Sequence, residues 1–364
     1  MREPWAVTDL FEPLTFTRGP DMKNRVMLAP LTNSQSHPDG RLSDDDFRWL
    51  TMRAQGGFGL TMTAAAHVQA VGQGFPNQVG VFGDEHLEGL TRLADAIRAG
   101  NSVSVVQLHH AGNRSPAELV GTPVCPSDDA PSGARALTTE EVEQLVEDFI
   151  AAAVRSERAG FDGVEVHGAH GYIVCQFLSS QINQRTDRYG GSLENRSRVL
   201  FDIVAGIRQR CGEDFNVGVR LSPERFGMKL GEIIEVAQRL MDEGAIDYLD
   251  MSLWDVNKEP EEDEFKGRSL MSWFTDMERG DVRLGVAGQV RSGTDARRCL
   301  DEGCDFVLVG RAAIVHHDWP DKVQADAEFT PIELPVTRAY LDEEGLSEAF
   351  INYMAERWDD FVSD

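Results

Sequence analysis

The chain has 364 residues, with 35 Lys and Arg against 61 Asp and Glu, and a formal net charge of −26. Its length fits one large domain or two ordinary ones. The 41% of apolar residues suffices for a sizeable core, which excludes disorder as the overall class. The strong negative charge argues against phosphate-rich partners, so we expect neither nucleic acid nor an anionic membrane surface.

The cysteines are scattered, and none stands in a C-x-x-C pair. This dispersed, odd-numbered set is typical of reduced thiols and offers no cluster for an iron–sulfur centre. No stretch approaches the ~18 consecutive apolar residues of a membrane span. We therefore expect a soluble, cytoplasmic protein. The cysteines are Cys125, Cys175, Cys211, Cys299 and Cys304.

Short apolar runs bounded by turn residues predict strands along most of the chain. These runs lie at 25–29, 59–63, 103–108, 163–167, 216–221, 248–252, 284–287 and 306–309. Amphipathic patterns between them predict helices, each followed closely by a glycine. The clearest lie at 140–159, 193–211, 232–243 and 294–302. The first also follows Thr138 with Glu141 three residues on, the pattern of a capping box.

Strands that alternate with helices at this spacing indicate a parallel sheet with crossover helices. Eight strand candidates in ~300 residues fit a closed (β/α)8 TIM barrel. A doubly wound open sheet is the alternative. That fold usually carries G-x-G-x-x-G after its first strand, where this chain has Ala29-Pro30-Leu31-Thr32.

We assign residues 1–320 to the barrel and 321–364 to a C-terminal extension. The extension contains a predicted helix at 347–361, and we expect it to pack on the barrel or to lie at a contact between copies of the chain. An acidic segment at 255–264 follows the sixth strand. It is interpreted as a solvated loop or a lid.

In a barrel, chemistry collects at the carboxyl ends of the strands. The seventh strand runs into Gly288 and the eighth into Gly310-Arg311. Backbone N–H groups at such turns, together with a guanidinium, favour a phosphate. Arg220 ends the fifth strand and could pair with an interior carboxylate or neutralise an anionic ring. Gln107 offers an amide that can both donate and accept, as a heterocycle requires.

The fourth strand runs into His167, His170 and Tyr172. A zinc site is one hypothesis, although the first strand lacks the H-x-H pattern usual in barrel metallohydrolases. The alternative is a clamp, in which two imidazole N–H groups hold a carbonyl oxygen and Tyr172 supplies a proton. A third interpretation makes all three ordinary loop residues with satisfied hydrogen bonds.

Several longer motifs decide among these hypotheses. The chain reads HGAHGYIVCQFLS from His167 and NQRTDRYGGSLENR from Asn183. It also reads NRVMLAPLT at 24–32, VQLHHAG at 106–112, VGVRLSP at 217–223 and LVGR at 308–311. In order and spacing these motifs resemble the old yellow enzyme family of FMN-dependent ene-reductases, over residues 10–320.

The resemblance implies a barrel that holds FMN non-covalently at its mouth. Ala65 and Gln107 would contact the isoalloxazine ring, and Arg220 would lie at its pyrimidine edge. Thr32 would hydrogen-bond near the reactive edge and tune the redox potential. By motif position, the implied FMN-binding set is Ala29, Pro30, Leu31, Thr32, Ala65, Gln107, His167, Arg220, Gly288, Gly310 and Arg311.

The resemblance also implies a two-step reaction, in which NADPH or NADH reduces FMN and an α,β-unsaturated carbonyl compound then accepts the hydride. His167 and His170 would bind the carbonyl oxygen, and Tyr172 would protonate the α-carbon. His109 stands where many relatives carry a Trp or a small residue. It would lie in the substrate pocket, unless its imidazole faces the surface. No metal is implied.

Two other functions fit the same barrel. One is a flavin oxidase or dehydrogenase with O₂ or another acceptor, and the other is a non-catalytic flavin-binding protein. The expected partners are an enone-type small molecule and, in a homo-oligomer, further copies of the chain.

Overall fold

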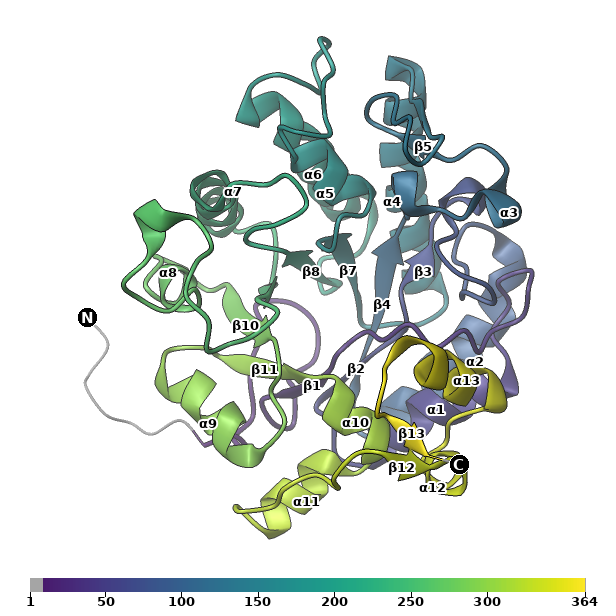
Figure 1. Ribbon diagram of the computed structural model, residues 1–364, viewed down its shortest axis with the longest axis vertical. Coiled ribbons are helices and arrows are strands. Elements are labelled where there is room, and N and C mark those ends of the chain that lie inside the picture. Colours follow the sequence, from purple (N-terminus) through teal and green to yellow (C-terminus); the bar gives the residue numbers. More distant parts are fainter. Residues whose placement is uncertain (1–8, 364) are drawn as a thin grey trace.

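The computed structural model describes residues 9–363, so residues 1–8 of the predicted barrel segment lie outside the described part. Within that part, eight parallel strands form a closed barrel (Figure 1). β11 pairs with β1, and β2 pairs with β4, which completes the ring. The strands, in order round the barrel, are β1 (Val26–Leu28), β2 (Leu60–Met62), β4 (Val103–His109), β7 (Gly163–Gly168), β8 (Asn216–Leu221), β9 (Tyr248–Ser252), β10 (Arg283–Ala287) and β11 (Phe306–Val309).

The (β/α)8 barrel prediction is therefore confirmed, and the open doubly wound sheet is wrong because this sheet closes on itself. Each predicted strand is present within one residue at either end. The predicted helices are α4 (Thr139–Arg158), α6 (Leu193–Arg210), α7 (Leu230–Glu243) and α9 (Gly293–Asp301). The capping box of Thr138 and Glu141 is formed at the start of α4.

Helices surround the strands on the outside of the barrel (Figure 1). The remaining longer ones are α1 (Asp44–Gln55) and α2 (Leu87–Ala99). Among residues 9–363, no helix combines the length and apolar composition needed to cross a membrane. The shorter elements are α3 (Ala117–Val120), α5 (Ile173–Leu178), α8 (Ser272–Thr275), α10 (Arg311–Val315), α11 (Trp319–Ala325), β3 (Ala66–His67), β5 (Val124–Cys125) and β6 (Arg135–Ala136), with 3₁₀ turns at Ala70–Gly72, Asp84–His86, Gly112–Arg114 and Asp263–Phe265.

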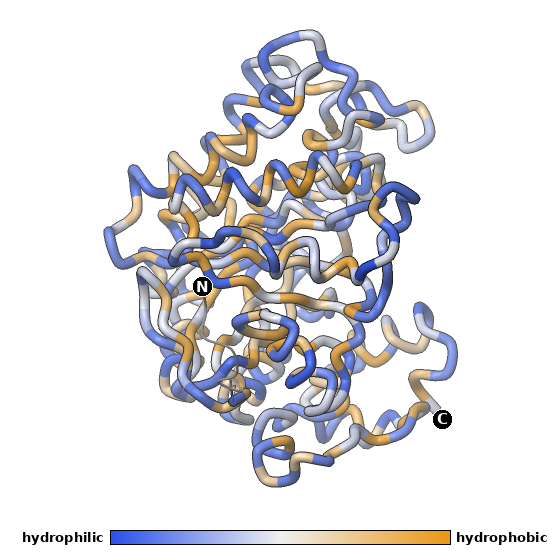
Figure 2. Tube along the Cα trace, turned by 90° about the vertical axis from the view of Figure 1, so that its left-hand side faces the viewer, coloured by the Kyte–Doolittle hydropathy of each residue, from blue (hydrophilic) through white to orange (hydrophobic). Residues whose placement is uncertain are grey.

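Two apolar layers hold the barrel together. Because side chains alternate along a strand, one face packs against the helices and the other fills the barrel interior. Figure 2 shows the hydrophobic residues concentrated on inner segments and hydrophilic ones on peripheral loops. The inner layer contains Met27, Met62, Val105, Tyr248 and Phe306. These apolar side chains fill the barrel interior. The cavity of the barrel therefore lies at the other end, at the carboxyl ends of the strands.

The C-terminal segment packs on the barrel beside α1. Arg53 of α1 donates to the backbone oxygen of Glu344 at 2.7 Å, and the rings of Trp49 and Phe350 meet edge to face at 5.0 Å. The segment comprises β12 (Val336–Thr337), α12 (Arg338–Glu343), α13 (Glu348–Arg357) and β13 (Val362–Ser363). The helix predicted at 347–361 ends earlier, at Arg357, because Trp358 is extended; Asp360, with φ 63°, then turns the chain back so that β13 pairs with β12.

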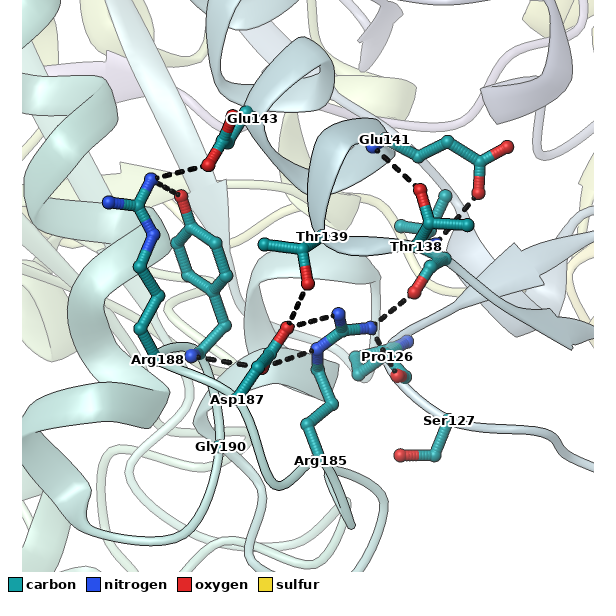
Figure 3. A network of polar contacts seen from close by, with 12 residues as sticks. Pro126, Ser127, Thr138, Thr139, Glu141, Glu143, Arg185, Asp187, Arg188 and Gly190 are labelled. Carbon is teal, nitrogen blue, oxygen red and sulfur yellow. Dashed lines mark hydrogen bonds and ion pairs between the residues drawn. The ribbon is translucent and has the colours of Figure 1, made fainter.

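The motif at 183–196 does not line the open end of the barrel. Its residues instead hold the loop between α5 and α6 in place. Arg185 is ion-paired with Asp187 at 2.5 Å and donates to the oxygen of Pro126 at 3.0 Å (Figure 3). Thr139, the first residue of α4, donates to Asp187 at 2.7 Å. The Arg185 guanidinium lowers the pKa of the Asp187 carboxyl. This network ties the loop between α5 and α6 to the start of α4.

The acidic segment at 255–264 is a loop, as predicted, and its charges are paired with the loop after β8. Lys258 forms ion pairs with Glu224 and with Glu261, the latter at 3.1 Å. Arg225 lies 2.9 Å from Glu261. The segment is therefore held to its neighbour, although several of its carboxylates face solvent.

Candidate active site

A cavity of about 430 Å³ opens at the mouth of the barrel, at the carboxyl ends of β1, β7, β8, β9, β10 and β11. Trp358 from the C-terminal segment completes its wall. Residues at the ends of six strands and one residue of the C-terminal segment thus converge on one space. Of the residues predicted from the sequence, the lining includes Ala29, Pro30, Leu31, His170, Arg220, Gly288, Gly310 and Arg311.

Gly288 is needed because of a close backbone approach at the end of β10. A Cβ at this position would lie 2.9 Å from the nitrogen of Asp255 and 3.0 Å from the carbonyl carbon of Trp254. Any side chain would push the loop after β9 away from the cavity. Gly310 is different, since a Cβ there would meet Leu31 and Ala29 only at ordinary contact distances.

Two arginines mark one end of the cavity. Arg291 and Arg311 both line it, and among residues 9–363 neither has a carboxylate within ion-pair distance. Burial, followed by the charge of Arg291, lowers the pKa of Arg311, so the two guanidiniums are close enough to repel each other. Like charges without a counter-ion favour binding of a dianion such as a phosphate.

Arg220 and Gln107 are each held by a carboxyl group inside the barrel. Arg220 Nε lies 2.9 Å from Asp250 Oδ2, and Gln107 Nε2 donates to Glu165 Oε1 at 2.8 Å. The ion-pair interpretation of Arg220 is correct, and the same side chain also lines the cavity. The two interpretations made from the sequence are therefore compatible.

The two histidines after the fourth barrel strand, β7, form a pair. His170 Nδ1 lies 3.3 Å from His167 Nε2, and the backbone N–H of Ala169 donates to His167 Nδ1 at 3.2 Å. His170 Nε2 lies 2.7 Å from Ser252 Oγ. Because His167 Nδ1 accepts, the neutral ring carries its proton on Nε2, the nitrogen that faces His170.

The His170 backbone is strained into this position. Its φ is 60°, in the left-handed region, and its N–H donates to Ser222 Oγ at 3.0 Å. Strain of this kind persists only where surrounding contacts impose it, and it concentrates at functional sites. Burial lowers the pKa of both histidines well below the ordinary value, followed by the neighbouring His170 and His109 rings for His167 and by Arg220 for His170. Both rings are therefore neutral hydrogen-bond donors.

Tyr172 and His109 extend this cluster. The Tyr172 ring lies 5.1 Å from the His167 ring and 4.3 Å from the His109 ring. Arg114 lies over the Tyr172 ring at 5.0 Å. Burial raises the pKa of Tyr172, which keeps its phenol protonated.

His109 is buried, so the surface-directed interpretation of its imidazole is wrong. Its Nδ1 lies 3.0 Å from Gln78 Nε2, which also donates to the oxygen of Ala65 at 2.7 Å. Strand β3 lies beside the end of β4 and covers it. Thr32 is half-buried, directly after Leu31.

The other predicted residues do not line the cavity themselves. His167 and Tyr172 lie against the lining residue His170, with ring centroids 5.0 Å and 6.4 Å from its ring. The remaining four are Thr32, Ala65, Gln107 and His109. In the described part of the chain, no group of three or more His, Cys, Asp or Glu side chains is arranged to hold a metal ion.

Sequence reasoning missed several residues of this site. Ser252 is the last residue of β9, so the strand-end rule could have found it. Arg291 directly precedes Ser292, the N-cap of α9, which was also a usable signal. Gln78 and Arg114 lie in segments without a periodic pattern and gave no signal, and Trp358 lies in the helix predicted at 347–361, where nothing marked it as a site residue.

The chain matches the NADH:flavin oxidoreductase / NADH oxidase family model over residues 9–329. It is 39% identical over 331 residues to a probable NADH-dependent flavin oxidoreductase of Bacillus subtilis, covering 88% of each chain. It is 33% identical over 337 residues to an NADPH dehydrogenase of Bacillus pumilus, covering 90% of this chain and 97% of that one.

Among solved structures, the old yellow enzyme homologue from Zymomonas mobilis superposes with a TM-score of 0.80 at 26% identity. The superposition covers 94% of this chain and 99% of that one. The family match, the relatives and the barrel agree with the motifs described above. The chain therefore belongs to the NADH:flavin oxidoreductase / NADH oxidase family, and it is an FMN-containing, NAD(P)H-dependent oxidoreductase of the old yellow enzyme type.

Proposed function

We propose that the protein is an ene-reductase, which uses NADPH or NADH to reduce the carbon–carbon double bond of an α,β-unsaturated carbonyl compound. The observation that carries this proposal is the pairing of two neutral imidazoles, His170 Nδ1 and His167 Nε2, 3.3 Å apart at the edge of the cavity. Tyr172 lies beside them with a protonated phenol. A carbonyl acceptor needs both kinds of donor.

The cavity residues fit FMN. Arg291 and Arg311 would hold its phosphate, and the backbone of Ala29, Pro30 and Leu31 would support the ring. The chemistry that FMN would supply at this site is hydride transfer between the nicotinamide and the β-carbon of the substrate. Gln107 and Arg220 would contact the pyrimidine part of the ring, and Thr32 would tune its potential.

The histidine pair can act as a clamp through a change of tautomer. The Ser252 hydroxyl can either accept from or donate to His170 Nε2, which lies 2.7 Å away. When it donates, the His170 proton moves to Nδ1, next to the N–H of His167. Both rings would then donate to one carbonyl oxygen, where they would stabilise the negative charge that develops as the double bond is reduced.

Tyr172 would protonate the α-carbon. Its raised pKa ensures that the phenol carries its proton at neutral pH, and Arg114 over the ring stabilises the charge that remains after transfer. A non-catalytic flavin-binding protein has no use for such a donor. A flavin oxidase would likewise work without the imidazole clamp.

We also propose a cytoplasmic location and a homo-oligomer. All five cysteines are free thiols, which suits a reducing compartment. In residues 326–335, between α11 and β12, Ile332 is 42% exposed and Leu334 is 43% exposed. The two large apolar side chains line the same surface pocket, which supports a contact between copies. Sedimentation of the Ile332→Ser variant, with Leu334→Ser added, would test that contact.

An anaerobic visible spectrum tests the function directly. The purified yellow protein should bleach with NADPH and recover its colour when cyclohexenone is added. Bleaching without recovery by the enone, but with fast recovery in O₂, would replace the ene-reductase with an oxidase. A bound flavin that NADPH and NADH leave oxidised would support the non-catalytic alternative. Comparing NADPH with NADH in the same experiment shows which donor is preferred.

A further inference from the structure

A second polar layer lies inside the barrel, directly below the residues of the cavity. Interior side chains follow one another every second residue along a strand, so Glu165 lies one layer below His167 on β7. The register places Gln107 beside Glu165 and Arg220 beside Asp250. The layer therefore connects two residues of the expected flavin site to two carboxyl groups.

The one cation near these carboxyl groups in the described chain is the Arg220 guanidinium, which contacts Asp250. Glu165 and Asp250 are completely buried, and Arg220 is 5% exposed. From the neighbouring strands, Arg220 and Tyr248 are the charged or titratable groups that act on the pair, and His167 lies one layer above Glu165 on β7 itself. The other interior side chains round the ring are apolar, among them Met27, Met62, Ala287 and Leu308.

The two carboxyl groups have unequal surroundings. Asp250 has the Arg220 guanidinium at 2.9 Å, whereas Glu165 accepts from the Gln107 amide at 2.8 Å and has the neutral Tyr248 phenol as a further neighbour. Among described residues, Glu165 Oε2 has no hydrogen-bond partner. Burial raises the pKa of both groups, and the Asp250 charge raises that of Glu165 further. An ionised carboxylate without a cation is very costly in such a place, so the first proton resides on Glu165.

We propose that Glu165 and Asp250 form an unequal, redox-linked proton site below the flavin: Glu165 is a permanent neutral acid that positions Gln107, and Asp250 binds a proton when the flavin is reduced. The proposal rests on the proposed placement of FMN over Gln107 and Arg220. Both carboxyl residues are positioning residues, because neither lines the cavity.

The charge balance explains the second proton. A hydride brings two electrons and one proton, so it adds one negative charge to the cofactor. Arg220 then has two anions to neutralise, Asp250 and the reduced ring. When the Asp250 carboxylate takes one proton from solvent, the guanidinium is released from its pair and the added charge is compensated. No further reactant is required.

Infrared and redox measurements on the holoenzyme test this proposal. Near neutral pH, the oxidised protein should show a carboxylic-acid C=O band that disappears in Glu165→Gln. A second acid band should appear on reduction by dithionite and be absent in Asp250→Asn. The matched control is Asp162→Asn, at the opposite end of β7, where Asp162 accepts from Ser104. This control should leave both bands in place.

The pH dependence of the flavin midpoint potential counts the protons. Each proton taken up with two electrons contributes a slope of about 30 mV per pH unit. The wild-type slope should correspond to two protons and that of Asp250→Asn to one. The potential itself should change little in Glu165→Gln, because an amide is a neutral isostere of the acid, and should rise in Asp250→Asn.

Two outcomes would overturn the proposal. One is the absence of an acid band in the oxidised wild-type protein. The other is a reduced-minus-oxidised spectrum without a new acid band, and neither readout requires a variant to fold. The measurements use dithionite rather than an enone, so they remain valid if the ene-reductase function fails. In that case cyclohexenone would not restore the colour, while the proton count would be unchanged.

Discussion

The two ends of the cavity hold opposite kinds of polar group. At the β7 end, His167 is buried and His170 half-buried, and the two rings contact each other and are neutral. At the β10 and β11 end, Arg291 and Arg311 are exposed, permanently charged and without a carboxylate partner in the described chain. One end is arranged so that charge can develop there during a reaction, and the other so that an existing charge can be bound.

The difference follows from solvent access. A dry site strengthens each dipole, but it makes a permanent charge costly, so neutral imidazoles suit it. At a solvent-exposed site, screening weakens each electrostatic contact. The same screening reduces the repulsion between two guanidiniums, so they can lie close together before a dianion binds. Variants that change one end of the cavity at a time therefore show whether the other end keeps its function.

The largest effect is expected from removing both imidazoles. In the double variant His167→Ala with His170→Ala, flavin reoxidation by cyclohexenone should slow by about 10⁴-fold, because each donor of this type is typically worth about 10²–10³. Stopped-flow spectroscopy measures this rate. The double variant should also lose the charge-transfer colour of oxidised flavin with a phenol. Retained colour would contradict the clamp. His37→Ala, which removes an exposed imidazole, is the control.

Tyr172→Phe should slow the same step by about 10²-fold or more, since a general acid usually contributes at least that factor. Flavin reduction by NADPH should stay within a factor of two or so of wild type, because no proton is needed there. If the two half-reactions slow equally, Tyr172 is not the proton donor. Tyr189→Phe, which removes a buried phenol outside the cavity lining, is the control.

Arg311→Ala should weaken FMN binding by roughly 10–100-fold, the range expected for hydrogen bonds to a charged group. The loss should shrink at high salt, because Arg311 is exposed. Fluorescence titration of the apoprotein with FMN measures the affinity. Arg239→Ala, which removes an ion pair with Glu243 on α7, should have no effect. Equal losses in both variants would mean that Arg311 acts only through the overall charge.

The smallest effect is an absence of pH dependence. Because burial lowers the pKa of His167 and His170, both rings remain neutral as the pH falls from 8 through about 6.5, the value of a free imidazole. The rate of reoxidation by enone should therefore show no break near pH 6.5 due to these rings. A break there that is lost in the double histidine variant would show that one ring is protonated in the folded enzyme.

Much of this arrangement could be predicted from local sequence patterns. The strand and helix periods, the capping box before α4 and the residues at the strand ends all depend on neighbours along the chain. Such patterns place Gly288, Gly310 and Arg311 at one mouth. The helix at the C-terminus was predicted too long, because the chain is extended at Trp358 and turns at Asp360 into the distant pairing of β13 with β12.

By itself, then, the sequence determined the barrel, the family and the cofactor, since alternating periods and ordered motifs are local properties of a chain. The tertiary structure decided which polar groups meet. In the folded chain, Gln78 contacts the buried His109 ring and the Ser252 hydroxyl contacts His170. Trp358 forms part of the cavity wall. Those contacts arise from strand register and from loops without periodicity, where the partner lies far along the chain and no local pattern specifies it.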